Sequence, residues 1–255
     1  MDDEPKKPQP PFNGGLSLTS RPHVPPSWIN WKSSRALQPH EALKANTALA
    51  ALLDRVDRQL AERLRSCAPS YRCDKWRYCA ICGPIREARL VQEYQARLLR
   101  PAELAHVTLT TRAIERLTRQ ALQDLAAKYN LLRRQKRFKQ AVGGVIVNIQ
   151  AEHGASGWLV HLHAVIDHRG GLSKTWLKDQ WSKLGGGWSV DFQIIVPETQ
   201  HRVLAYGARS PDLPHDSQLL WQFYSATRGY TLIRASGSFH RLHGRPRRRR
   251  AQVTA

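Results

Sequence analysis

The run from Trp158 to Ile166 (WLVHLHAVI) limits the fold more than any other part of this chain. It is short and rich in β-branched and aliphatic residues, which predicts a β-strand. Successive side chains of a strand point to opposite faces, so His161 and His163 share one face, about 6.6 Å apart along the backbone. The other face is apolar and comprises Val160, Leu162, Ala164 and Ile166. We therefore expect a strand that buries one face against helices and presents two imidazoles on the other.

A second strand-like run, Val145 to Ile149, precedes the first, and the glycine-bounded stretch 154–157 separates the two. This arrangement predicts a hairpin that brings Glu152 beside the two histidines. Two imidazoles and a carboxylate with open coordination positions suit a catalytic divalent metal ion. The alternative is that His161 and His163 are polar residues on a solvated strand face and that Glu152 is a solvated carboxylate at a strand end.

Local patterns of apolar and turn-forming residues predict the remaining elements. Strands are expected near 104–111 and 188–196, and helices near 49–64, 85–99, 112–139, 173–184, 197–206 and 216–227. In the helix at 197–206, Glu198, Arg202 and Tyr206 would lie on one face at intervals of four residues.

Four cysteines follow the first helix with the spacing C-x5-C-x5-C-x2-C. They are Cys67, Cys73, Cys79 and Cys82. The last two form a tight chelating pair, and the first two can complete a tetrahedral zinc site. Because four thiolates leave no open position, this zinc would be structural. The alternative is a set of buried or redox-active thiols.

The chain of 255 residues has 40 Lys and Arg against 20 Asp and Glu, a net charge of +20. Such an excess predicts a polyanionic partner, most simply nucleic acid. One dense basic run is a candidate DNA-binding surface, although it is also typical of a solvated helix face: Arg133, Arg134, Lys136 and Arg137. The sequence contains neither a signal-peptide pattern nor a run of about 20 apolar residues, so we expect a soluble, cytoplasmic protein with no membrane partner.

These patterns divide the chain into four parts. We expect a disordered Pro-rich segment at 1–30, a helical region with the cysteines at 40–100, the histidine domain at 101–240 and a disordered basic tail at 241–255.

Three short motifs occur in a fixed order along the histidine domain. They are Ala105–Thr111 (AHVTLTT), Val160–Ala164 (VHLHA) and Tyr206–Arg209 (YGAR). With the cysteine cluster before them and the Leu219–Phe239 stretch after them, the chain resembles HUH endonucleases, and within these the rolling-circle replication initiators of small plasmids. The resemblance covers roughly residues 67–240.

The resemblance implies an α+β fold, with a central antiparallel sheet flanked by helices and a small N-terminal helical module that binds zinc through four cysteines. It implies that His161 and His163 lie on a central strand and bind Mg²⁺ or Mn²⁺, with Glu152 as our candidate for the third ligand. It also implies that Tyr206 attacks single-stranded DNA at a plasmid origin hairpin, leaving a 5′-phosphotyrosine and a free 3′-hydroxyl. A host helicase and polymerase would then be partners.

Two positions depart from the pattern of this family. Where relatives often have Lys after the tyrosine, this chain has Ala208 and Arg209, and where some have a carboxylate one turn before it, this chain has Arg202. Both arginines are candidate phosphate contacts. Glu198, a further turn away, another tyrosine, or water would have to act in the terminating cleavage.

Other interpretations of the same residues remain open. Other tyrosines, namely Tyr129, Tyr224 and Tyr230, are candidate packing residues. A transposase or relaxase of the same superfamily would use the same chemistry. A zinc-containing DNA-binding protein without catalysis would need no tyrosine, and a Mg²⁺-dependent nuclease that activates water would not become attached to its product.

Overall fold

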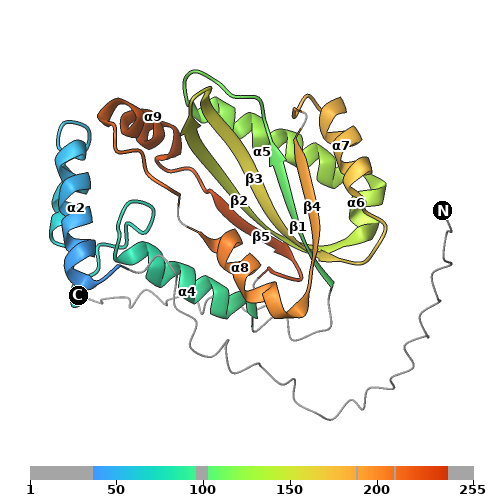
Figure 1. Cartoon of the computed structure of the whole chain (residues 1–255), viewed down its shortest axis with the longest axis horizontal. Coiled ribbons are helices and arrows are strands. Elements are labelled where there is room, and N and C mark those ends of the chain that lie inside the picture. The colour runs from blue at the N-terminus through green and yellow to red at the C-terminus, as the bar shows by residue number, and fades with distance from the viewer. Residues whose placement is uncertain (1–36, 96–102, 188, 210, 241–255) are drawn as a thin grey trace, which may run out of the picture.

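The computed structural model describes residues 37–95, 103–187, 189–209 and 211–240. A five-stranded antiparallel sheet in the order β4-β1-β3-β2-β5 lies at its centre (Figure 1). The strands are β1 (Glu103–Thr110), β2 (Val142–Gly154), β3 (Gly157–His168), β4 (Val190–Ile195) and β5 (Ile233–Gly237). The expected α+β fold with an antiparallel sheet flanked by helices is confirmed. The predicted hairpin is formed by β2 and β3, and β3, which carries both histidines, is the central strand.

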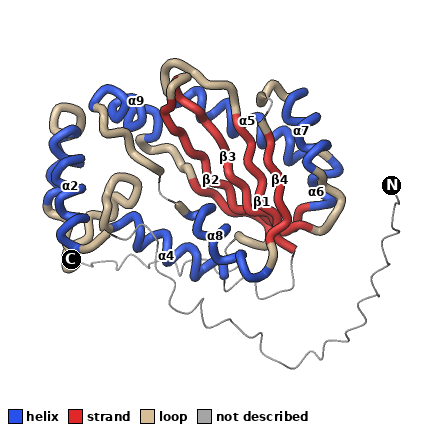
Figure 2. Tube along the Cα trace, viewed as in Figure 1, coloured by secondary structure: helices blue, strands red, loops and turns tan. Residues whose placement is uncertain are grey.

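Helices cover both faces of this sheet (Figure 2). The helices are α2 (Pro39–Leu53), α3 (Arg58–Arg65), α4 (Cys82–Gln95), α5 (Arg119–Arg134), α6 (Lys136–Ala141), α7 (Lys174–Lys183), α8 (Gln200–Ala208) and α9 (Ser217–Thr227), with a 3-10 turn η1 (Pro197–Thr199) before α8. Side chains of α5, α6, α7 and α9 share one core with the sheet, and side chains of α4 and α8 share another. In the described part of the chain, no helix has the length and apolarity needed to cross a bilayer.

The apolar face of β3 forms the larger core, as its alternation predicts. Leu162 and Ile166 are fully buried there. They lie in the same cluster as Leu125 of α5, Trp181 of α7 and Phe223 of α9. Burial of such side chains contributes about 1.5–3 kcal/mol each, so this core fixes which face of β3 carries the histidines.

The opposite face of the sheet is apolar at one end and polar at the other. At the apolar end, Val165 of β3 and Ile146 of β2 pack with Leu204 of α8. A Cβ atom on Gly207 would lie 3.2 Å from Val165 Cγ2, so glycine at this position lets α8 approach β3 closely. This close approach brings the neighbouring residue, Tyr206, to the polar end of the same face.

Capping residues set helix starts that differ from two of the predicted helices. The apolar pattern at 49–64 is split into α2 and α3, because the Asp57 side chain accepts a hydrogen bond from Leu60 N and starts a new helix. The pattern at 112–139 begins late, because Ile114 forms a β-bridge with Trp158. Thr118 then caps α5 by accepting a hydrogen bond from Ala121 N.

The predicted helix at 197–206 also begins later than expected, at Gln200. Glu198 lies in the preceding 3-10 turn. The prediction that Glu198, Arg202 and Tyr206 share one face of a single α-helix is therefore wrong, since Glu198 is outside that helix.

The N-terminal part of the described chain forms a module of α2, α3 and the cysteine loop, which lies beside α9 at one end of the sheet (Figure 1). Leu220 and Tyr224 of α9 belong to the core of this module. Helix α4 leaves the module and packs along α8. The boundary at residue 100 stays a prediction, and both segments expected to be disordered, 1–30 and 241–255, lie outside the described residues.

Candidate functional site

The structure brings together the two histidines of β3 and the tyrosine of α8. The rings of His161 and His163 lie 4.8 Å apart, centroid to centroid, at 85°. The ring of Tyr206 lies 4.8 Å from that of His163, also at 85°. The histidines are buried, at 6% and 5% exposure, whereas Tyr206 is 39% exposed. A molecule in solvent can therefore reach the tyrosine while the histidines hold fixed positions beneath it.

Glu152 lies at the margin of this group. Its Oε1 is 3.9 Å from His161 Nε2, and its side chain is 52% exposed. In strand register Glu152 is opposite Leu159, while Gln150 is opposite His161. Glu152 is thus near His161 without being held against it, and its role as a third metal ligand stays a prediction.

His106 of β1 is a member of the site that the sequence did not single out. Its Nε2 is 3.3 Å from His163 Nδ1, and the two rings stack with centroids 5.3 Å apart. The ring of Tyr206 is 5.8 Å from that of His106. Thr108 adds its Oγ1 at 3.2 Å from the same Nδ1. The sequence alone indicates only that His106 and Thr108 share one face of a strand. The register between β1 and β3 places that face beside His163.

These contacts leave defined nitrogen atoms free. His163 Nε2 and His161 Nδ1 are buried and have no hydrogen-bond partner among the described residues. Buried polar atoms of native proteins rarely lack a partner, so these nitrogens can accept a water molecule, an ion or a ligand. His163 is thus held through Nδ1 and can offer Nε2 to a metal ion.

Burial also keeps these imidazoles neutral. It lowers the pKa of His163 to about 3, with smaller contributions from the nearby His161 and His106. Burial likewise lowers the pKa of His161, against the opposite effect of the Glu152 carboxylate, and it lowers the pKa of His106. Neutral imidazoles carry the lone pair that a metal ligand needs. Two neutral imidazoles are thus available as ligands, whereas Glu152 does not form a gathered set of three ligand atoms with them.

A contact from β2 fixes the end of α8. Asn148, which lies opposite His163 in the sheet, donates from Nδ2 to the carbonyl oxygen of Arg209 at 2.9 Å. The Arg209 guanidinium lies 5.6 Å from the ring centre of Tyr206 and pairs with Asp212 at 2.7 Å. Arg209 is thus near the tyrosine, whereas Arg202 is exposed on α8 one turn away.

The basic run does not lie beside the histidines. Its residues belong to α5 and α6, which cover the opposite face of the sheet. Arg133 donates to Ser236 Oγ at 3.2 Å, and Arg137 donates to the carbonyl oxygen of Gly171 at 2.6 Å. Arg134 and Lys136 lie between them in the sequence. A DNA strand at Tyr206 would have to pass around the sheet to reach this run.

The four cysteines form a second, separate centre. Their sulfur atoms are buried and all lie within 4.8 Å of one another. Cys67 Sγ is 3.4 Å from Cys79 Sγ and 3.6 Å from Cys82 Sγ, and Cys73 Sγ is 3.7 Å from Cys82 Sγ. Tetrahedral zinc with bonds of about 2.3 Å separates its sulfurs by roughly 3.8 Å. This cluster can therefore bind a metal such as zinc. Among the described residues, it is the only group of three or more His, Cys, Asp or Glu side chains that could hold a metal ion.

Neighbouring groups prepare the cluster for a metal. Asn46, which is 1% exposed, donates from Nδ2 to Cys79 Sγ at 3.3 Å and accepts a hydrogen bond from Ala80 N at 2.8 Å. A hydrogen bond from Cys73, helped by that from Asn46, lowers the pKa of Cys79 to about 5. Burial raises the pKa of Cys67 to about 11. These contacts favour the thiolate form at Cys79 over that at Cys67.

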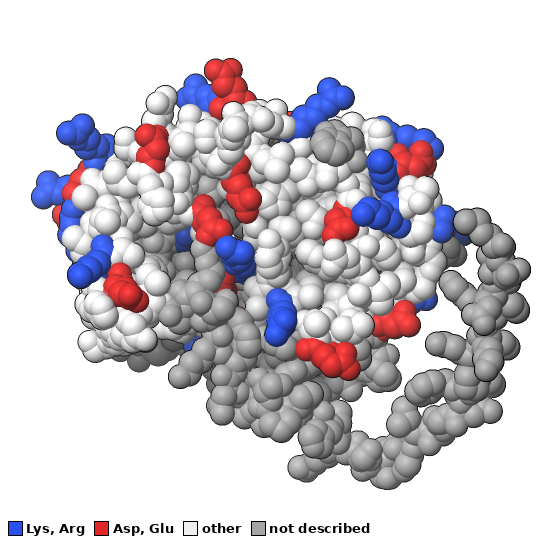
Figure 3. Space-filling view, in the orientation of Figure 1, with Lys and Arg blue, Asp and Glu red and all other residues white. Residues whose placement is uncertain are grey.

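Positive charge is not gathered into one field on the face shown in Figure 3, where Lys and Arg are interspersed with Asp and Glu. On this face, a polyanion would therefore meet only local groups of cations. Comparisons of the whole chain with protein-family models, with curated proteins and with solved structures found no match.

Proposed function

We propose that this protein nicks and rejoins single-stranded DNA through Tyr206, as an initiator of rolling-circle plasmid replication. The observation that carries the proposal is the accessible tyrosine 4.8 Å from His163, above two buried, neutral histidines on a central strand. A nucleophile beside two imidazoles that can bind a metal ion is the arrangement that attack on a phosphodiester needs.

The reaction is a transesterification. The Tyr206 oxygen attacks phosphorus and loses its proton, a new phosphotyrosine ester forms, and the bond from phosphorus to the 3′ oxygen breaks. The departing oxygen takes up a proton and becomes a free 3′-hydroxyl. Because one ester replaces another, the step is reversible and consumes no ATP. The free hydroxyl is the end that a host polymerase extends while a host helicase separates the strands.

The residues of the site have separate parts in this reaction. Mg²⁺ or Mn²⁺, when bound, supplies positive charge that neutralises and orients the scissile phosphate. His161, His163 and Glu152 would hold that ion. His106 and Thr108 hold the ring of His163, and Asn148 holds the end of the helix that presents Tyr206. Arg209 adds a cation near the tyrosine, and Arg202 can contact a neighbouring phosphate.

A denaturing gel tests the proposal directly. Purified protein is incubated with labelled single-stranded origin DNA and Mn²⁺, and we expect a band of protein-linked DNA. Tyr206→Phe should abolish this band, because phenylalanine has no oxygen to form the ester. Tyr71→Phe is the matched control, since Tyr71 is a tyrosine exposed at 64% in the cysteine loop.

Two other results would assign a different function. Cleavage without a protein-linked product would mean a nuclease that activates water. A second candidate, a DNA-binding protein without catalysis, is favoured by the cysteine cluster, which alone among described groups has its ligand atoms already gathered. That candidate predicts no cleavage of a verified origin and DNA binding that Tyr206→Phe leaves unchanged.

A further inference from the structure

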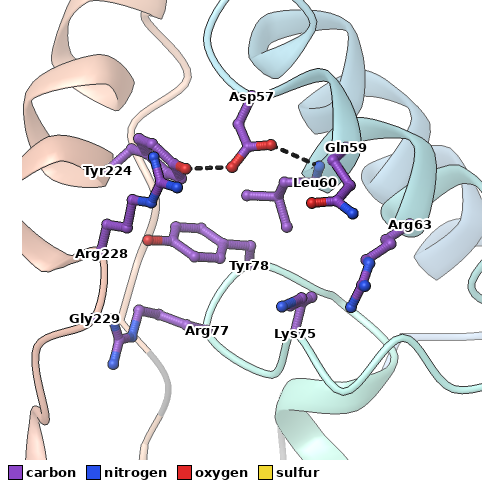
Figure 4. A pocket seen from close by; sticks show the side chains of 10 residues that line it. All are labelled: Asp57, Gln59, Leu60, Arg63, Lys75, Arg77, Tyr78, Tyr224, Arg228 and Gly229. Carbon is purple, nitrogen blue, oxygen red and sulfur yellow. Dashed lines mark hydrogen bonds between the residues drawn. The ribbon is translucent and has the colours of Figure 1, made fainter.

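A cavity of about 250 Å³ lies between the cysteine module and α9, away from the histidine site (Figure 4). Its walls come from α3, from the loop between Cys73 and Cys79, and from α9 and the residues after it. The lining residues are Asp57, Gln59, Leu60, Arg63, Lys75, Arg77, Tyr78, Tyr224, Arg228 and Gly229. None of them belongs to the histidine site.

The charge of the lining is strongly unbalanced. Four of the residues are cationic, and Asp57 is the one carboxylate. Asp57 is already engaged, because it accepts a hydrogen bond from Leu60 N at 2.9 Å and another from the Tyr224 hydroxyl. The hydrogen bond from Tyr224 lowers the pKa of Asp57, so this carboxylate stays charged.

Arg77 has a structural task that separates it from the other cations. It donates to the carbonyl oxygens of Thr227 and Tyr230, the latter at 2.6 Å, and so fastens the cysteine loop to the end of α9. The Tyr78 hydroxyl bonds to Thr227 Oγ1 at 3.0 Å and adds to this junction. The cavity therefore has fixed walls on both sides.

Three other cations line the cavity: Arg63, Lys75 and Arg228. Asp57 attracts Lys75 and Arg228, and the Arg228 guanidinium lies 5.8 Å from the ring centre of Tyr224. Within the described residues, no carboxylate forms an ion pair with any of them. In Figure 4, Arg228 lies on one side of the Tyr78 ring, and Arg63 and Lys75 lie on the other. Like charges around one cavity repel each other, and an anion between them reverses that cost.

We propose that this cavity binds a phosphate group of a DNA strand through Arg63, Lys75 and Arg228. The choice of DNA as the carrier rests on the proposed function, whereas the preference for an anion rests on the cavity alone. The volume is below the range of about 300–1,000 Å³ that small-molecule sites occupy. A cation can contact a phosphate group without reading a base edge. The contact is thus to the backbone and independent of sequence.

This site gives the cysteine module a part in DNA binding. Lys75 and Arg77 lie between Cys73 and Cys79, so a metal held by the cysteines also fixes the loop that carries one of the phosphate contacts. A DNA strand bound in this cavity would contact both the cysteine module and α9.

The test compares two triple variants in a Tyr206→Phe background, where no nicking interferes. Arg63→Gln, Lys75→Gln and Arg228→Gln together remove the three pocket cations. Lys44→Gln, Arg55→Gln and Lys178→Gln remove three exposed cations elsewhere. Fluorescence anisotropy with a labelled single-stranded oligonucleotide lacking origin sequence measures the affinity of each. Circular dichroism and thermal melting establish that each variant is folded.

We expect the pocket variant to lose about tenfold or more in affinity at moderate salt, and the control variant to lose far less. The slope of log Kd against log salt should fall by about 0.7 for the one lost phosphate contact. Equal losses of affinity in the two folded variants would contradict a phosphate site in this cavity. They would show only that a lower net charge weakens DNA binding.

Further measurements distinguish DNA from free phosphate or a nucleotide as the ligand. They also distinguish the phosphate-site proposal from the nicking proposal. Inorganic phosphate and a deoxynucleoside monophosphate are titrated against the wild type and the pocket variant. Tight binding of the nucleotide that the pocket variant loses, with oligonucleotide affinity unchanged, would overturn DNA as the source. With Tyr206 restored, the pocket variant should still form the protein-linked product at saturating origin DNA. If the wild type forms no such product but the pocket variant still loses affinity, the nicking proposal fails and the phosphate site stands.

Discussion

At the scale of single residues, the two nitrogen atoms of His163 have different surroundings. Nδ1 lies against His106 and Thr108, while Nε2 has no partner among the described residues. A histidine that binds a metal through one nitrogen is normally held by a hydrogen bond at the other, and loss of that bond weakens metal binding. His106 is thus a positioning residue for the proposed metal site.

His106→Ala should therefore raise the Mn²⁺ concentration needed for half-maximal adduct formation by about 10–100-fold. The rate at saturating Mn²⁺ should change much less, since Tyr206 keeps its place. His215→Ala, at an exposed histidine, is the control. A lower maximal rate with unchanged Mn²⁺ dependence would mean that His106 acts on the tyrosine instead.

Burial of His163 also makes a prediction about pH. Its pKa is lowered to about 3 in the folded protein, against an ordinary histidine value near 6.5. The unfolded chain therefore binds a proton more readily between these values. The free energy of unfolding should be at its full value above pH 6.5 and should fall as the pH is lowered toward 3.

The magnitude follows from the size of the shift, because each pKa unit corresponds to about 1.4 kcal/mol. Urea unfolding from pH 7.5 to 4 without added Mg²⁺ or Mn²⁺ would measure the effect. His163→Gln should flatten this part of the profile. A parallel profile for the variant would show that other groups cause the acid sensitivity.

At the scale of elements, the contact of α8 with β3 decides where Tyr206 lies. A Cβ atom on Gly207 would lie 3.2 Å from Val165 Cγ2, so Val165 would have to move by a few tenths of an ångström, and a larger side chain would require more. Gly207→Val should cost about 1–3 kcal/mol of stability through overpacking. Displacement of Tyr206 by about 1 Å can slow a reaction by roughly 100-fold, so the adduct should also form more slowly.

Gly154→Val is the matched control for this substitution. Gly154 lies at the end of β2, and a Cβ atom there would meet nothing within 4 Å. Urea unfolding and the rate of adduct formation are measured for both variants. Similar behaviour of the two would show that the close approach of α8 is not what positions the tyrosine.

The elements that the sequence predicted well are those with local signals. The β2–β3 hairpin follows from alternation and from glycines at 154 and 157, and Ser173 caps α7 as its position before the helix indicates. The starts of α3 and α5 were missed because Asp57 and Thr118 cap helices within longer apolar patterns. In those two cases a capping hydrogen bond outweighed periodicity.

The candidate site shows the same division between local and distant signals. His161 and His163 share a face by strand alternation alone, so their pairing was predictable. The part of His106 depends on the register between β1 and β3, which no local pattern contains. The layer on which the basic run lies depends on helix packing, and the sequence gives no sign of it.

At the scale of the whole molecule, the cysteine cluster joins α2, α3 and the following loop into a module that leans on α9. If these cysteines hold zinc, Cys79→Ser should remove it and lower the thermal stability of the module, because structural zinc contributes folding free energy. Elemental analysis and thermal melting would measure both effects. Ser70→Ala, at an exposed position in the same loop, should change neither.

Because β5 is the last strand in the sequence, β2 lacks one of its two neighbours during synthesis. Strand β2 is bordered on one side by β3, its neighbour in sequence, and on the other by β5, which begins at Ile233. A growing chain therefore forms the hairpin long before the last strand exists. Until then the backbone of β2 from Gly144 to Asn148 is an open edge on which another chain can pair. Release from synthesis before Ile233 would leave that edge uncovered, so shortened products of this chain should aggregate where the full-length chain does not.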